Sequence, residues 1–452
     1  MSSKNIHSKN EENGRTTLPV LPADILIPGK AIDPGRFAVV ACDQFTQDKA
    51  YWDRVYKLAD GVPSAAHIML PEAFLDEGQK EIGRRIAGIN ETMADYLGRG
   101  VFDEYKESMI LTLRTFKTGK KRAGLVAAID LEQYDYKKGS VSPVRATEAT
   151  VLERIPPRVA IRRGARLEMP HIMILIDDPG MTVIEPLEKA AEAGAKTPAY
   201  DFELMEGGGN VKGWVLHRLE YENALNALKK LSEPEAFRKK YALPDDVPVM
   251  LLAIGDGNHS LASAKALYEE THAPEMRYAL AEIVNIHSPG IEFEPIHRVL
   301  MNIDPAEVEA EAKSYFGDDL IIGKGCAKAR GLSASGIKNA AEDHFRIEFV
   351  SKNIDAVWYV SRARHLLSAG AIQEFLDSFI SLHPEAKIDY IHGDSECKAI
   401  GRADNSCGFI LDAMPKSDLF PTVIKNGALP RKTFSMGNAE EKRYYFECRR
   451  IG

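Results

Sequence analysis

Apolar and polar positions follow two periods along this chain, and together they predict a fold of mixed helices and strands. Short apolar runs predict strands at Phe37–Ala41, Ser108–Lys117, Gly124–Asp130, His171–Ile176, Val249–Ile254, Phe345–Val350 and Ala356–Val360, and around Phe202–Met205 and Trp214–Leu219. Apolar residues at helical spacing predict helices after Cys42, twice within Pro71–Gly98, and at Glu185–Ala193, Tyr221–Leu231, Pro305–Phe316 and Gln373–Leu382. The sequence therefore predicts the α+β (mixed α/β) class.

A change of pattern near residue 300 predicts two domains in the 452 residues. The polar first residues predict a disordered tail over 1–17. A core domain with insertions is expected over 18–300 and a C-terminal α+β domain over 301–452, where the segment 388–411 resembles a strand–helix–strand unit.

Composition narrows the functional class. The formal net charge of −8 argues against a general nucleic-acid or acidic-membrane binder. Five cysteines without CxxC spacing favour free thiols over disulfides or a zinc site. Neither a signal peptide nor an apolar run of about 20 residues is present, so we expect a cytoplasmic protein that does not span a membrane.

The segment VPVMLLAIGDGNHSLASAKALYEE, residues 247–270, combines a buried strand, a turn and a helix. Gly255 and Gly257 are expected to allow a sharp turn with positive φ, and Asn258 or Ser260 to cap the helix. The amide groups at a helix N-terminus bind anions, most often phosphate. Asp256 and His259 add a titratable pair to the same turn. A structural turn without a ligand is the alternative, because neither the Walker nor the dinucleotide pattern is present.

Two basic segments are candidate phosphate contacts. Residues 145–166 hold six arginines, with Arg122 just upstream, and Arg154 and Arg158 flank a Pro-Pro pair that interrupts a helix. Arginine grips phosphate from two donors. Near the C-terminus, Arg431 and Lys432 are followed by Thr433 and Ser435. The alternatives are a solvated helix face for the first segment and a basic loop for the second.

The remaining histidines favour structural roles. His287 and His297 are too far apart in sequence for typical metal-ligand spacing and are expected to be hydrogen-bonded structural groups. His171 opens an apolar strand and is expected to be a satisfied core histidine. His392 and Asp394 form another His–Asp pair in sequence, which alone is weak evidence of chemistry.

Five ordered motifs resemble the domain-of-unknown-function-1015 (DUF1015) family, over nearly the whole chain after the tail. They are AVVACDQFT near residue 40, RATEATVLERIPPR from 145, GDGNHSLASAK from 255, PIHR from 295 and LPRKTFSM from 429. This resemblance implies no established activity.

The turn is also similar, more distantly, to the phosphate-binding turn of the ParB/sulfiredoxin fold, which includes free-serine kinases. The likeness implies a ParB/sulfiredoxin-like core. Relatives often carry Asp-Gly-His-His-Arg, where this chain has Asn258 for the first histidine and Ser260 for the arginine. By analogy with such kinases, Glu148 stands where a catalytic acidic residue falls.

These observations lead to a phosphoryl-transfer hypothesis. The substrate would be a small phosphorylated or hydroxylated metabolite such as serine or phosphoserine, in the kinase or the phosphatase direction. Asp256 or Glu148 would orient or deprotonate the attacking group, and His259 and the arginines would offset phosphate charge. ATP or ADP with Mg²⁺ is the expected cofactor set if a nucleotide takes part. The alternative is a nucleotide- or metabolite-binding module without turnover. A DNA-binding ParB relative is disfavoured by the acidic charge balance.

Overall fold

The computed structural model describes residues 18–137, 139–194, 196–324, 343–363 and 365–452. The predicted tail over 1–17 and Cys326 lie outside these residues. The chain divides into two compact units. The first comprises residues up to 146, 150–291 and 439–452, and the second comprises 147–149 and 292–438. The predicted ranges 18–300 and 301–452 differ from these units, because the chain returns to the first unit at residue 439.

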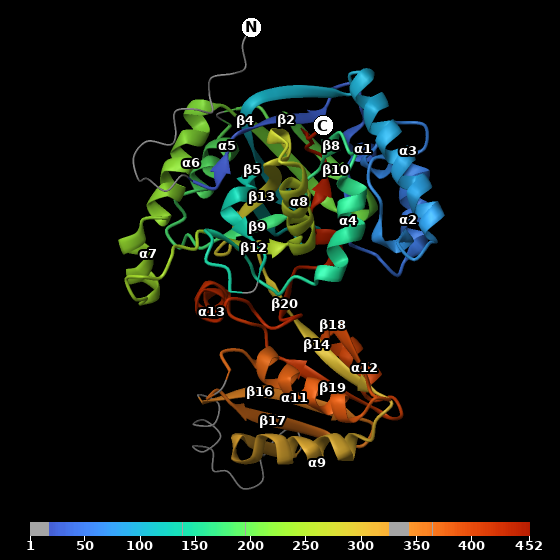
Figure 1. Ribbon diagram of the computed structural model, residues 1–452, viewed down its shortest axis with the longest axis vertical. Helices are drawn as coiled ribbons and strands as arrows, with labels where there is room; N and C mark the ends of the chain where they lie inside the picture. The colour runs from blue at the N-terminus through green and yellow to red at the C-terminus, as the bar shows by residue number, and fades with distance from the viewer. Residues whose placement is uncertain (1–17, 138, 195, 325–342, 364) are drawn as a thin grey trace. The chain divides into compact units, whose positions relative to one another are not determined.

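The first unit is built on a mixed sheet of 11 strands (Figure 1). Its main path runs in the order β10-β11-β4-β5-β13-β9-β12-β7-β6, while β1 pairs with β5 and β2 with β4. These strands are β1 (Val20–Leu21), β2 (Ala23–Pro28), β4 (Phe102–Thr115), β5 (Lys121–Asp130), β6 (Tyr134–Asp135), β7 (Val144–Ala146), β9 (Met173–Ile176), β10 (Tyr200–Leu204), β11 (Gly209–Leu216), β12 (Leu252–Asp256) and β13 (Tyr278–Asn285). The predicted hairpin of β4 and β5 is confirmed, with Ile110 opposite Val126.

Helices of the first unit occupy the connections between these strands. They are α1 (Pro34–Phe37), α2 (Lys49–Ala59), α3 (Gln79–Gly98), α4 (Ile155–Arg162), α5 (Glu185–Glu192), α6 (Arg218–Leu231), α7 (Pro234–Tyr241) and α8 (Asn258–Thr271). The predicted strand at Phe37–Ala41 is confirmed for Val39–Val40, which form β3, whereas Phe37 is the last residue of α1. Asp33 accepts hydrogen bonds from the amides of Gly35 and Arg36 and starts α1, with Pro34 at its first position.

Both faces of this sheet are buried, because neighbouring residues of one strand enter different cores. Ile110 packs in a core with residues of α2 and α3, whereas Leu111 packs in a core with residues of α6 and α8. The sheet is therefore the middle layer between two sets of helices. Helix α8 also contacts α4 through a small cluster of Ile155, Val159, Ala262 and Leu267.

The last 14 residues complete the first unit with two short strand pairs. β21 (Tyr444–Tyr445) pairs with β3 (Val39–Val40), and β22 (Arg449–Arg450) pairs with β8 (Leu167–Glu168). All but one of the residues from Tyr444 to Ile451 are buried. This C-terminal return brings Lys442–Tyr445 beside the motif that begins at Ala38.

The second unit is a seven-stranded sheet in the order β15-β17-β16-β19-β14-β18, with β20 also paired to β14. Its strands are β14 (Phe293–Met301), β15 (Leu320–Lys324), β16 (His344–Ser351), β17 (Asp355–Ser361), β18 (Lys387–His392), β19 (Ser406–Leu411) and β20 (Phe434–Met436). Its described helices are α9 (Pro305–Phe316), α11 (Ser368–Leu382), α12 (Asp394–Gly401) and α13 (Leu419–Asn426). The predicted strand–helix–strand segment is present, but β18 and β19 flank β14 on opposite sides. The mixed helices and sheets of both units confirm the predicted α+β class.

Candidate active site

The turn between β12 and α8 takes the predicted form, with one glycine in the left-handed region. Gly257 has φ of +80°, and a Cβ there would lie 3.0 Å from the Cα of Ile172. Both facts require glycine at this position. The expectation of positive φ at Gly255 is wrong, because Gly255 lies within β12.

The first residues of α8 have no side-chain cap. Gly257 occupies the cap position itself, so the expected capping by Asn258 or Ser260 is wrong. Asn258 is the first helical residue, and its Oδ1 atom is buried with no hydrogen-bond partner among the described residues. Buried polar atoms are rarely left unpaired, so this atom marks a place where a donor from outside the chain would be favourable.

A hydrogen-bonded chain of side chains leads away from this turn. Ser260 Oγ lies 2.7 Å from His171 Nε2, and His171 Nδ1 lies 2.8 Å from the hydroxyl of Tyr445. The Tyr445 oxygen also accepts a hydrogen bond from the Cys42 amide at 3.2 Å. His171 is satisfied, as expected, but by groups from the turn and from the C-terminal return rather than by the core.

Opposite charges gather beside the same turn. Asp256 Oδ1 accepts a hydrogen bond from the Gly257 amide at 3.0 Å, and Asp256 Oδ2 lies 3.3 Å from Lys442 Nζ. Burial raises the pKa of Asp43, but the charges of His171 and Lys442 and a hydrogen bond from Gln44 lower it more. The net pKa of Asp43 therefore lies below its ordinary value. Lys442 thus lies near two carboxylates, with only 9% of its side chain exposed.

A buried ionic network fixes the segment that carries Lys442 and Tyr445. Arg443 donates hydrogen bonds to Glu282 and Glu447 at 2.5 Å each, and to the Pro170 carbonyl at 3.1 Å, next to His171. Burial raises the pKa of Glu282, while Arg443 and Arg122 lower it more, so Glu282 stays ionised. Arg122 therefore serves this network rather than a ligand, since its side chain is almost fully buried.

His259 faces another part of the chain. Its Nε2 accepts a hydrogen bond from the Val151 amide at 3.3 Å. The imidazole therefore holds the loop before α4 against the start of α8, and its expected role at a phosphate stays a prediction.

The arginines of residues 145–166 do not converge on one site. Arg158 pairs with Glu72, and Arg162 and Arg163 pair with Glu168 and Glu270. Arg145 is buried and donates to backbone carbonyls. Arg154 is exposed on the short helix before α4. Of the two predicted phosphate contacts here, Arg154 keeps an exposed side chain, whereas Arg158 already holds a carboxylate.

The C-terminal basic segment binds a carboxylate of the same chain, that of Glu148. Glu148 lies in the second unit, where its carboxylate accepts hydrogen bonds from the amides of Lys432 and Thr433. Burial raises the pKa of Glu148, while Lys432 and these amides partly offset that effect. Arg431 pairs with Asp377 at 2.5 Å. Glu148, Arg431 and Lys432 therefore have hydrogen-bond or ion-pair partners within the second unit. The sequence did not predict these partners.

The other histidines and cysteines have structural surroundings. His297 lies 2.9 Å from Asp394 and accepts a hydrogen bond from the Leu411 amide, so it is a hydrogen-bonded structural group as predicted. His287 lies 2.6 Å from Asp177. The four described cysteines are free thiols, as predicted.

Within the described residues, one group of three side chains has the spacing of a metal site. It consists of Glu307, Glu311 and His383 in the second unit. Asp43 and Asp256 contribute no such group of three. No described helix is both long and apolar enough to cross a membrane.

Four residues of the cluster at the turn were not predicted as site residues: Asp43, His171, Lys442 and Tyr445. Asp43 lies in the AVVACDQFT motif, which was available as a signal. Lys442 and Tyr445 could not be found from spacing, because some 180 residues separate them from the turn. We use "turn cluster" below for these four residues together with Asp256, Gly257, Asn258 and Ser260.

The family of the chain follows from a match to a family model. Residues 26–379 match the model described as "Protein of unknown function (DUF1015)". The chain belongs to this family. The match spans the turn and the motifs at residues 38, 145 and 295, while no curated protein matches the chain.

Several solved structures are weakly similar to this DUF1015 protein. A mutant of free serine kinase in complex with ADP has a TM-score of 0.38 and 11% identity, covering 74% of this chain and 94% of that one. A conserved hypothetical protein from Pyrococcus furiosus has a TM-score of 0.36 and 11% identity, with coverages of 72% and 94%. SbnI with C-terminal truncation from Staphylococcus aureus has a TM-score of 0.35 and 8% identity, with coverages of 69% and 82%. Similarity at this level transfers neither a ligand nor an activity.

Proposed function

We propose that this protein is a phosphoryl-transfer enzyme acting on a small hydroxylated or phosphorylated metabolite, such as serine or phosphoserine. The observation that carries the proposal is the turn cluster. Among the described residues it combines uncapped helix amides, a buried Asn258 oxygen without a hydrogen-bond partner, and a nearly buried lysine that acts on two carboxylates. Amides and a lysine hold phosphate oxygens, and a carboxylate accepts the proton of an attacking hydroxyl.

In the kinase direction, the substrate hydroxyl oxygen forms a bond to the phosphorus while the bond from phosphorus to the donor oxygen breaks. The hydroxyl proton passes to Asp256. The amides after Gly257 and the Lys442 ammonium group stabilise the negative charge on the transferring group. In the phosphatase direction a water oxygen forms the bond to phosphorus and the bond from phosphorus to the substrate oxygen breaks. The proton that Asp256 takes from water then passes to the leaving oxygen. We assign the role of general base to Asp256 and not to Glu148, because the Glu148 carboxylate already accepts hydrogen bonds from two backbone amides.

The carboxylates of the turn cluster are the candidate ligands of Mg²⁺ in a nucleotide-dependent reaction. Mg²⁺ is held by one or two carboxylates together with phosphate oxygens, and Asp43 and Asp256 are the residues that would hold it. The ion would neutralise phosphate charge. ATP or ADP would be the phosphoryl donor in the kinase direction.

A direct test incubates the purified chain with serine and ATP or ADP, and separately with phosphoserine, with and without Mg²⁺. Phosphoserine and free phosphate are measured. We expect turnover to fall ~10–100-fold in Lys442→Met, because one charge-assisted contact is lost. Lys432→Met is the matched control, and its turnover should stay within twofold of wild type. Equal turnover in Lys442→Met and wild type would contradict the proposal. His259→Ala tests the earlier expectation that this ring takes part in turnover.

A second function, ligand binding without turnover, is favoured by one observation. By the resemblance to the Asp-Gly-His-His-Arg turn, Ser260 takes the place of an arginine, and its hydroxyl lies 2.7 Å from His171 Nε2. An enzyme of this kind uses cations to stabilise charge in the transition state, and the described arginines near the turn are paired or exposed. Stabilisation by ADP or phosphoserine with no product formed would support binding alone.

A further inference from the structure

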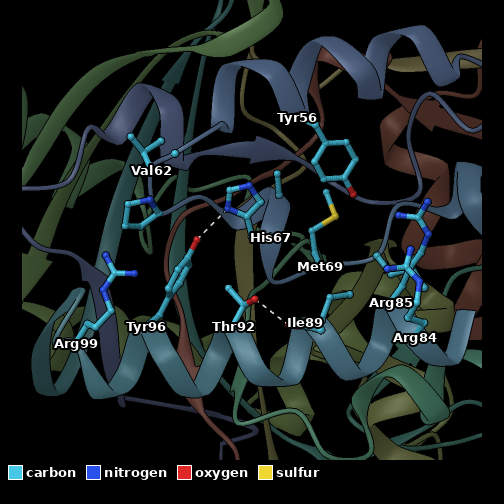
Figure 2. A pocket seen from close by; sticks show the side chains of 15 residues that line it. Tyr56, Val62, His67, Met69, Arg84, Arg85, Ile89, Thr92, Tyr96 and Arg99 are labelled. Carbon is cyan, nitrogen blue, oxygen red and sulfur yellow. Dashed lines mark hydrogen bonds between the residues drawn. The ribbon is translucent and has the colours of Figure 1, made fainter. Parts of the chain in front are cut away.

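A cavity of about 490 Å³ lies in the first unit, where α3 faces α2 and the segment that follows α2. Figure 2 shows Tyr56, His67 and Met69 facing Ile89, Thr92 and Tyr96 of α3 across this space. None of these residues belongs to the turn cluster. The volume is in the range of pockets that bury small organic molecules.

The middle of the cavity is apolar with a few neutral hydrogen-bonding groups. Met69 and Ile89 are buried, at 7% exposure each. Tyr96 accepts the Ser64 amide at 2.9 Å, and its hydroxyl lies 3.1 Å from His67 Nδ1. Burial lowers the pKa of His67 below its ordinary value, so the ring is neutral at pH 7.

Two hydrogen-bonding positions in the cavity are unused. Among the described residues, neither the Tyr56 hydroxyl nor His67 Nε2 has a hydrogen-bond partner. The Tyr96 hydroxyl accepts the Ser64 N–H and also donates to the Ser64 carbonyl at 3.4 Å. Its contact with His67 Nδ1 leaves Nε2 as a donor or an acceptor according to the tautomer of the ring. The Tyr56 hydroxyl and His67 Nε2 therefore offer neutral hydrogen bonds to a ligand.

Arginines lie at both ends of the cavity in Figure 2, with Arg84 and Arg85 at one end and Arg99 at the other. The rise of an α-helix places Arg85 and Arg99 about 21 Å apart along α3. Among the described residues, Arg85 is held by both carboxylate oxygens of Glu77, whereas Arg84 and Arg99 pair with exposed carboxylates of their own helix, at Glu81 and Asp95. Exposed pairs of this kind contribute little, so their guanidinium groups remain able to bind an incoming anion.

We propose that this cavity binds a small organic carboxylate with an apolar body. The body packs between Met69 and Ile89, and the carboxylate is held by Arg84 at one end or Arg99 at the other, together with the neutral hydrogen-bonding groups. A phosphate site is not proposed here, because the middle of the cavity is apolar and a fully hydrated dianion would lose its water there. The site is independent of the function proposed for the turn cluster.

The test uses 4-phenylbutyrate as the probe, with the uncharged 4-phenylbutyramide as its analogue. Binding to the full chain is measured by titration calorimetry or by saturation-transfer NMR. Gly88 lines the cavity, and a Cβ at this position would meet nothing within 4 Å, so Gly88→Leu fills the space. Gly83→Leu is the matched control on the same helix, also in open space but outside the cavity. Both changes replace a helical glycine with a better helix former, so the fold is kept.

We expect saturable binding of the carboxylate, at least fivefold weaker binding of the amide, and at least tenfold weaker binding in Gly88→Leu. Gly83→Leu and Lys442→Met should stay within twofold of wild type. Absence of saturable binding by wild type, or equal loss in the two glycine variants, would overturn the proposed site. Equal affinity for the acid and the amide would overturn the preference for an anion. A loss confined to Lys442→Met would place the probe at the turn cluster and also overturn the proposal.

Discussion

Two turns in this protein have the same local chemistry but different occupants. The turn after β12 and the turn at Arg431–Thr433 each present backbone amides beside a lysine. In the second unit, the amides of Lys432 and Thr433 hold the carboxylate of Glu148. In the first unit, the start of α8 has no side-chain cap, and the nearby Lys442 faces Asp256.

The comparison shows that an anion-binding sequence need not bind a ligand. Amides and cations favour a negative group, and a carboxylate of the same chain satisfies them as well as phosphate does. What distinguishes the turn cluster is an acceptor with no partner in the part of the chain that the structure describes, Asn258 Oδ1, next to uncapped amides. A site for an external ligand is therefore better recognised by groups that remain unpaired than by basic residues alone.

The largest expected effect is the loss of ligand binding in Lys442→Met. The neutral side chain keeps the length but removes the charge that would contact phosphate, at a cost of ~1.5–3 kcal/mol or about 10–100-fold in affinity. Calorimetric titration with ADP and with phosphoserine measures this change. The matched variant in the second unit, Lys432→Met, should leave the affinity within twofold. A similar loss in both variants would remove the distinction between the two turns.

Gly257→Ala is expected to destabilise the first unit by ~1–3 kcal/mol, because alanine at φ of +80° is strained and its Cβ meets Ile172. Chemical denaturation with a probe of the first unit, such as Trp52 fluorescence, measures this change. Gly83→Ala is the control, since Gly83 lies at an exposed position of α3 and the change should be neutral or slightly stabilising. A Gly257→Ala protein as stable as Gly83→Ala would contradict the turn geometry.

The two turns should respond to pH with opposite signs. The lowered pKa of Asp43 means that its ionised form stabilises the fold. That contribution is full above the ordinary pKa of 3.8 and is lost as pH falls through the lower folded value. The raised pKa of Glu148 gives the opposite pH dependence. The contribution of Glu148 to stability is largest below the ordinary pKa of 4.5 and falls as pH rises through the folded pKa.

Unfolding free energies of wild type, Asp43→Asn and Glu148→Gln between pH 3 and 7 test these signs. The difference between wild type and Asp43→Asn should shrink toward the acid end. The contribution of Glu148, measured as the unfolding free energy of wild type minus that of Glu148→Gln, should fall as pH rises. Parallel curves for the two variants would show that the carboxylates do not differ in environment.

The smallest expected effect is that of Arg431→Ala. Its pair with Asp377 is more than half exposed, so we expect a change in unfolding free energy below ~0.5 kcal/mol and no change in ADP affinity. A tenfold loss of ADP affinity in this variant would restore Arg431 as a phosphate contact.

The fold was more predictable from sequence than the site. Local apolar periods predict helix Pro305–Phe316 and the hairpin of β4 and β5. The turn at Gly257 is predicted because a glycine separates an apolar strand run from residues at helical spacing. These features depend on neighbours in sequence.

The partners of the turn could not be predicted in the same way. Lys442 reaches Asp256 only because the chain returns to the first unit after residue 438. The arginines of 145–166 were misjudged for a related reason. Their carboxylate partners, such as Glu72 and Glu270, are distant in sequence, and composition does not reveal which cations are already paired.

Backbone amide NMR on the isotope-labelled full chain, titrated with ADP, tests the central claim most directly. The largest shifts are expected at the amides of Gly257–Ser260, with those of Lys432 and Thr433 unchanged. Shifts confined to Lys432 and Thr433, or the absence of any shift at the start of α8 under saturating ADP, would contradict the account.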